Sequence, residues 1–220
     1  KELEQHPQKD KKRVDILIEM INSPQFASKV KVSWQEEALA ISQKTGYKLG
    51  EGNALLFYYS NADPESGSPE ADSILNKLKI IEKTVNNKIF TGRLLTNLGI
   101  VHTDQGKESG VDELLKAATL FTEAGYYQGI SSAYGAVSDY YLNVNTNYPL
   151  AMDYALKSLQ IAEKEKSPYF QRRNWVNIGF IYSAIADYEN ALHAFKKANH
   201  FAEMEKKSYA TPFICENREG

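Results

Sequence analysis

The stretch NWVNIGFIYSAIADYENALHAFKKA, residues 174–198, places small residues at regular intervals in two segments of helical periodicity. Gly179 lies in the middle of the first segment, and Ala191 and Ala198 lie in the second. A glycine in a helix interior costs about 1 kcal/mol relative to alanine, so its presence there needs a compensating contact. We expect Gly179 to face Ala191 and Ala198, so that the two helices approach each other closely as an antiparallel pair.

The pattern around Gly179 recurs with a period of about 40 residues. A small residue preceded by an apolar residue lies 41 residues earlier, at Ser138, and again 39 residues before that, at Gly99. After each, apolar or small residues follow in helical register at Val111, Leu115 and Ala118, at Ala151, Ala155 and Ser158, and at Ala191, Phe195 and Ala198. A fixed period of this length is typical of repeat architectures, in which each unit buries its apolar face against the next.

The repeats divide the chain into helix pairs joined by short turns. Segments such as KTGYKLG (44–50) and EAGYYQG (123–129) carry the lysines and glycines that are typical of helix ends. We therefore predict one all-α solenoid over residues 1–220, with pairs at about 10–45, 50–86, 90–125, 128–165 and 170–205. Thr211 and Pro212 favour a helix start, so we expect a truncated sixth pair at 209–220 and a parent protein that continues beyond it.

One copy of the repeat carries a complete motif. WVNIGFIY (175–182) followed by ALHAF (191–195) matches the spacing W-x2-L-G-x2-Y and A-x3-F, with Ile178 in place of leucine. This copy resembles the tetratricopeptide repeat (TPR), and the period of about 40 residues is similar to that of the longer repeats in bacterial signalling proteins. The resemblance implies a right-handed α-α superhelix of about five helix pairs.

Two further segments resemble the sensor regions that precede histidine kinase or transcriptional regulator domains in bacteria. They are HPQKDKKRVDIL (6–17) and ALAISQKTGYKLGEGNAL (38–55). This resemblance implies that the chain is the N-terminal sensory or scaffolding region of a larger signalling protein. It also favours a periplasmic or other extracytoplasmic location over the cytoplasm.

The composition argues against several classes of partner. A net charge of −2 leaves no basic surface for nucleic acid. The longest apolar runs are too short to insert into a membrane. A single cysteine, Cys215, excludes an intrachain disulfide and a thiolate metal cluster. Because no nucleotide-binding or catalytic motif is present, we expect no cofactor and no enzymatic activity.

One group of residues keeps a metal-dependent enzyme open as a distant alternative. Glu189, His193 and His200 lie on roughly one face of a predicted helix, where they could form a metal triad. An exposed helix face explains the same pattern, and structural zinc usually needs four ligands at motif spacing. We therefore assign neither catalytic residues nor a metal site.

A binding face is better supported. In stacked helix pairs the first helix of each pair lines the concave surface, and the helical period selects the residues that face it: Arg93, Asn97, Ile100, Asp139, Arg173, Asn177 and Phe180. An arginine fork suits a carboxylate or phosphate. The resemblance adds that TPR proteins clamp a peptide's C-terminal carboxylate with asparagines and basic residues at such positions. Here the copy with Asp139 separates the two Arg/Asn pairs, which argues against one clamp built from both.

These patterns predict a module that binds a protein or peptide in its groove. Two alternatives remain. The chain could act as a free-standing adaptor, or it could form a homodimer through the apolar face of the unfinished C-terminal pair.

Overall fold

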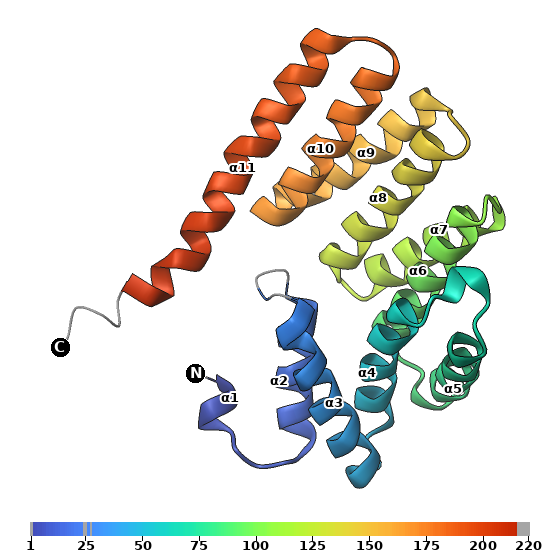
Figure 1. The fold of residues 1–220 in the computed structure, drawn as a ribbon, viewed down its shortest axis with the longest axis vertical. Coiled ribbons are helices and arrows are strands. Elements are labelled where there is room, and N and C mark those ends of the chain that lie inside the picture. Colours follow the sequence, from blue (N-terminus) through green and yellow to red (C-terminus); the bar gives the residue numbers. More distant parts are fainter. Residues whose placement is uncertain (1, 24–25, 27, 215–220) are drawn as a thin grey trace. The chain divides into compact units, whose positions relative to one another are not determined.

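The computed structural model describes residues 2–23, 26 and 28–214, with side chains for 3–23, 26 and 30–206. Within these residues the chain folds into helices joined by short turns, without a strand (Figure 1). Each helix packs mainly on its neighbours along the sequence, so the predicted all-helical repeat fold is confirmed. The chain divides into two compact units, Lys1–Asn97 and Leu98–Gly220, and the prediction of a single domain stays a prediction.

Unit 1 contains two complete helix pairs. Its elements are α1 (Glu2–Gln5), α2 (Lys11–Asn22), α3 (Ser28–Thr45), α4 (Lys48–Asn61), the 3-10 turn η1 (Pro64–Ser66), α5 (Pro69–Val85) and the first part of α6 (Lys88–Asp104). Helix α2 pairs with α3 and α4 with α5, while α3 packs on α4. Val14 and Leu17 of α2 and Ala38 of α3 are fully buried in the core of the first pair.

Unit 2 continues the same arrangement. It holds the end of α6, then α7 (Ser109–Glu123), α8 (Tyr127–Asn143), α9 (Tyr148–Lys164), α10 (Pro168–Ala184) and α11 (Tyr188–Ile214). Helix α8 pairs with α9 and α10 with α11, and α9 packs on α10. Val137 of α8, Ala155 of α9 and Ile178 of α10 lie in one core that runs through both pairs.

The predicted end of the fifth pair is wrong. Helix α11 continues without a break to Ile214, so 206–209 is not a joint and no new helix begins at Thr211 and Pro212. The reason is local, because residues 203–208 lack the glycine, asparagine or proline found at the joints between the other pairs and consist mostly of helix formers. Residues 215–220, with Cys215, lie outside the described residues.

The small residues do bring paired helices together, although the side chain nearest to Gly179 is neither of the two predicted ones. A Cβ on Gly179 would lie 2.6 Å from Cε1 of Phe195, so Gly179 makes room for this ring rather than for Ala191 and Ala198. In α8, the buried Oγ of Ser138 donates a hydrogen bond to the backbone oxygen of Ala151 at 2.8 Å. Close approach within a pair is thus achieved by different chemistry in different copies.

Helices α6 and α7 approach each other closely at two facing glycines. A Cβ on Gly110 would lie 2.5 Å from the backbone oxygen of Gly99, and a Cβ on Gly99 would lie 2.9 Å from the backbone oxygen of Gly110. Leu114 fills the space beside this contact and is fully buried. Only two facing glycines allow the backbones to meet in this way.

The turns repeat in backbone conformation as well as in position. A residue with positive φ ends a pair at Gly46, Asn86, Gly125 and Lys166, and another lies inside a pair at Gly106, Thr146 and Ala186. Glycine and asparagine enter this left-handed region readily, whereas lysine and alanine pay roughly 1–2 kcal/mol. The fold therefore imposes the turn even where the residue does not favour it.

Candidate functional site

The seven side chains predicted to bind a ligand all lie on the first helices of their pairs. Arg93, Asn97 and Ile100 lie on α6, Asp139 on α8, and Arg173, Asn177 and Phe180 on α10. The boundary between the units separates Arg93 and Asn97 from the other five. The two sets are described in turn, and a role in ligand binding stays a prediction for each.

In unit 1, Arg93 and Asn97 contact polar side chains of α4. Nη1 of Arg93 donates a hydrogen bond to Oδ1 of Asn53 at 3.1 Å. Oγ of Ser60 donates to Oδ1 of Asn97 at 2.7 Å, and Nδ2 of Asn97 donates to the backbone oxygen of Arg93 at 2.9 Å. Polar groups that the sequence assigns to a ligand therefore join α4 to α6.

In unit 2, Arg173 and Asn177 of α10 both contact Asp139 of α8. Nδ2 of Asn177 donates to Oδ1 of Asp139 at 2.6 Å, and Nη2 of Arg173 donates to Oδ2 at 3.4 Å. The side chains of Arg173 and Asp139 are 36% and 38% exposed, whereas Asn177 is buried. The structure thus unites three of the predicted residues in one cluster at the surface between α8 and α10.

This cluster contains an acidic side chain beside its arginine, whereas a site that binds a peptide carboxylate needs free positive charge. Partial burial raises the pKa of Asp139 above its ordinary value, and the nearby carboxylate of Asp104 adds to the rise. Arg173 and Asn177 lower the pKa but do not cancel the rise. With Asp139 ionised, Arg173 is already paired with one carboxylate and a second, Asp104, lies near enough to act on Asp139, so a further anion would meet repulsion. The cluster suits a neutral or cationic group better.

Exposed apolar side chains stand on either side of Asp139 in the repeat. Ile100, Asp139 and Phe180 each follow the small residue at the middle of their helix, in steps of 39 and 41 residues. Ile100 is 39% exposed and Phe180 is 53% exposed. The Phe180 ring meets the Phe195 ring edge to face, with centroids 5.5 Å apart. This row of equivalent positions, Ile100, Asp139 and Phe180, therefore combines apolar surface with one acidic group.

Behind the cluster lies a buried polar network that the sequence pattern misses. Ser131 of α8 and Ser158 of α9 contact each other through their hydroxyl groups at 2.9 Å, and Oγ of Ser158 donates to the backbone oxygen of Ser131 at 2.7 Å. Nδ2 of the buried Asn174 of α10 lies 3.5 Å from Oγ of Ser131. The repeat marks Ser158 as a small packing residue but carries no signal that Ser131 has partners 27 and 43 residues away in sequence.

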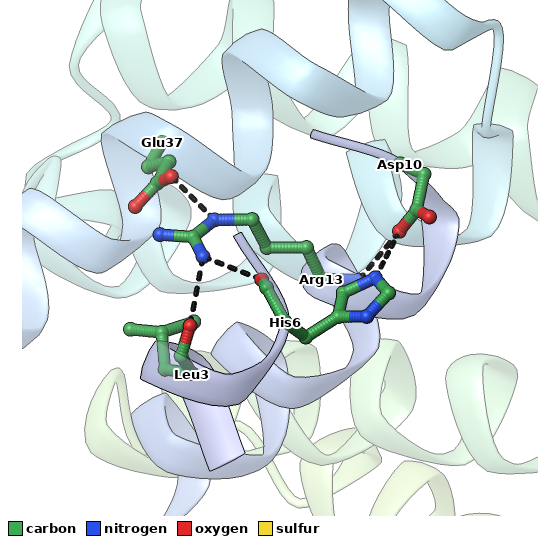
Figure 2. A network of polar contacts seen from close by, with 5 residues as sticks. All are labelled: Leu3, His6, Asp10, Arg13 and Glu37. Carbon is green, nitrogen blue, oxygen red and sulfur yellow. Dashed lines mark hydrogen bonds and ion pairs between the residues drawn. The ribbon is translucent and has the colours of Figure 1, made fainter. Parts of the chain in front are cut away.

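A second polar network holds the N-terminus of unit 1 (Figure 2). Nη1 of Arg13 donates to the backbone oxygens of Leu3 and His6, at 3.0 and 2.8 Å, and Nε donates to Oε1 of Glu37 at 2.7 Å. Asp10 caps α2 and also contacts the His6 ring at 2.8 Å. Arg13 therefore fastens α1 to α2 and α3. The sequence pattern gives no sign of this role of Arg13.

Two other points of the sequence analysis, a metal triad and insertion into a membrane, can be compared with the structure. Glu189, His193 and His200 do not come together as a group that could hold a metal ion, and no such group of three ligands occurs elsewhere in the described residues. Among the helices described, none is both long and apolar enough to cross a membrane. The absence of enzymatic activity stays a prediction.

Comparison with known proteins supports the fold alone. No protein-family model matches the sequence, and no curated protein matches it either. Among solved structures, the chain is similar to the crystal structure of BtubC (BKLC) from P. vanneervenii, with a TM-score of 0.61 and 14% sequence identity. The similarity covers 89% of this chain and 80% of that one. The likeness thus shows that this all-helical repeat fold occurs in a known protein.

Proposed function

We propose that this chain is a protein-interaction scaffold of tetratricopeptide-like type that binds a peptide segment on the first-helix face of unit 2. The observation that carries the proposal is the row formed by Ile100, Asp139 and Phe180. It offers exposed apolar surface beside a polar cluster on helices held rigidly by the repeat core. Repeat folds present such faces as extended binding surfaces. The motif WVNIGFIY with ALHAF supports the same class.

The charge on this face selects among peptides. Asp139 already accepts hydrogen bonds from Arg173 and Asn177, and Asp104 adds negative charge nearby. A peptide carboxylate would have to displace Asp139 from Arg173. A segment that places an apolar side chain on Ile100 and a lysine or arginine near Asp139 would instead gain both hydrophobic burial and charge attraction. We therefore favour a basic, apolar segment over a free C-terminus.

Selection from a random peptide library on the immobilised chain tests this proposal. We expect the enriched peptides to combine apolar residues with lysine or arginine and to lose binding to Ile100→Ser. Leu150→Ser is the matched control, because Leu150 on α9 has 38% exposure against 39% for Ile100 and lies outside the face. Asp139→Asn should weaken the binding of basic peptides and strengthen the binding of acidic ones. Equal binding to the parent, Ile100→Ser and Asp139→Asn would refute the proposal.

We also propose a sensory or scaffolding role within a larger bacterial signalling protein, outside the cytoplasm. Its support is the resemblance of residues 6–17 and 38–55 to sensor segments. The genomic reading frame around this segment is the direct test. A kinase or regulator domain in the same frame, with a membrane span before it, would support the proposal. A frame that encodes no further domain would favour the free-standing adaptor.

A further inference from the structure

The last helix pair of unit 2 exposes an apolar surface, here called the end face. It consists of the exposed side chains of Tyr188 and Leu192 on α11 and of Phe180 on α10, together with the half-buried ring of Phe195 on α11. Tyr188 is 71% exposed and Leu192 is 56% exposed. These two residues are one helical turn apart, and Phe195 continues the same stripe toward Phe180. Large apolar side chains gathered in this way are typical of an interaction surface.

The end face occupies positions that are covered in the preceding pair. Tyr188 and Leu192 correspond, 40 residues earlier, to Tyr148 and Met152 at the same places on α9. Both of these pack against the core of unit 2, together with Trp175 of α10, and α9 packs on α10. The end face therefore has the design of a helix–helix interface, and no helix covers it within the described part of unit 2.

The charges beside the end face point to one kind of partner. Glu189 and Lys196 flank Leu192 on the same edge of α11, two turns apart. Neither takes part in an ion pair with another described side chain. They lie at equal distances from the midpoint between Leu192 and His193. If a second α11 packs antiparallel about this midpoint, Glu189 of each copy lies opposite Lys196 of the other. The edge is therefore self-complementary.

We propose that the end face is a self-association surface, on which a second copy of this chain packs with its α11 antiparallel. A two-fold axis passes between Leu192 and His193, so both copies use the same residues. Tyr188, Leu192 and Phe195 form the apolar centre, and two Glu189–Lys196 pairs close its edges. This surface shares Phe180 with the row Ile100, Asp139 and Phe180, but its other residues lie on α11, and neither function requires the other.

A concentration series in sedimentation equilibrium tests the apolar centre. The parent should dimerise, and Leu192→Glu should remain monomeric over the same range. Leu156→Glu is the matched control, because Leu156 is 49% exposed on α9 outside the end face, and this variant should dimerise as the parent does. A parent that stays monomeric throughout, or a Leu192→Glu variant that dimerises normally, would overturn the proposal.

Charge reversal tests the register with variants at exposed positions that should not impair folding. Glu189→Lys and Lys196→Glu should each raise the dimer dissociation constant about tenfold, because each turns two attractions into two repulsions. The double variant should recover the parent affinity, and an equimolar mixture of the two single variants should form a heterodimer. If single and double variants associate alike, the antiparallel register is wrong. Ile100→Ser should leave the dimer intact, which separates this test from that of peptide binding.

Discussion

Gly99 and Gly135 both lie in helix interiors of unit 2, but an added methyl group would meet different surroundings at each. A Cβ on Gly99 would lie 2.7 Å from Cγ of Leu114 and 2.9 Å from the backbone oxygen of Gly110. A Cβ on Gly135 would have its nearest neighbour, Oγ of Ser158, at 3.8 Å, an ordinary contact. Alanine substitution at the two positions therefore separates packing cost from helix propensity.

The expected effects have opposite signs. Replacing a helix-interior glycine by alanine gains about 1 kcal/mol, and Gly135→Ala should keep this gain in full. Forcing a methyl group into a filled interface costs about 1–3 kcal/mol. At Gly99 one obstructing atom belongs to the backbone of α7 and can move only with the helix. We therefore expect Gly99→Ala to lower the free energy of unfolding by about 1–2 kcal/mol.

Urea unfolding followed by circular dichroism measures both variants. Because both glycines lie in unit 2, the same transition is compared, and its slope should stay constant if only stability changes. Should Gly99→Ala be as stable as Gly135→Ala, the close contact of α6 with α7 does not exist as described. A loss of stability in Gly135→Ala would show that α8 and α9 are packed more tightly than the distances indicate.

Three further predictions concern single polar groups. Arg13→Ala should lower the free energy of unfolding by about 1–3 kcal/mol and speed proteolysis within residues 2–9, whereas Arg13→Lys should restore part of the loss, because lysine cannot reproduce the guanidinium fork. Burial and the hydrogen bond to Asp15 raise the pKa of Tyr47 to about 12. Since an unfolded tyrosine ionises near pH 10, the stability that Tyr47 contributes is complete below about pH 10 and is lost as the pH rises toward 12. Tyr47→Phe should remove this part of the alkaline loss in unfolding experiments at graded pH. Ser138→Ala should cost about 0.5–1.5 kcal/mol in urea unfolding, because it deletes one buried hydrogen bond without leaving a cavity, and Ser138→Val should cost more through overpacking.

Most of the fold could be predicted from the period of the small residues. Gly99, Ser138 and Gly179 mark the middle of three first helices, and the structure has a helix pair at each of them. Such positions can be recognised in the sequence because a close approach of two helix backbones excludes nearly every larger side chain. The fifth pair was misjudged at its end because Thr211 and Pro212 favour a helix start locally, whereas α11 continues through them.

The candidate site was predictable only in part. The helical period placed Arg173, Asn177 and Asp139 on first helices, and these residues do meet. It could not show that they would bond to one another, since that depends on how α8 and α10 lie side by side. The hydrogen bond from Arg13 to the backbone oxygen of Leu3 could not be predicted either, because every residue has a backbone oxygen and the sequence does not show which one a side chain will contact.

The left-handed turn residues bear on how such a fold can be recognised in other sequences. Glycine, asparagine, lysine, threonine and alanine all adopt a positive φ at these turns, so the turns share a backbone conformation although their residue types differ. Two chains can therefore share this helical repeat fold with little sequence identity, as the 14% identity at a TM-score of 0.61 illustrates. Within this chain, the backbone conformation at the turns recurs from pair to pair where the residue type does not.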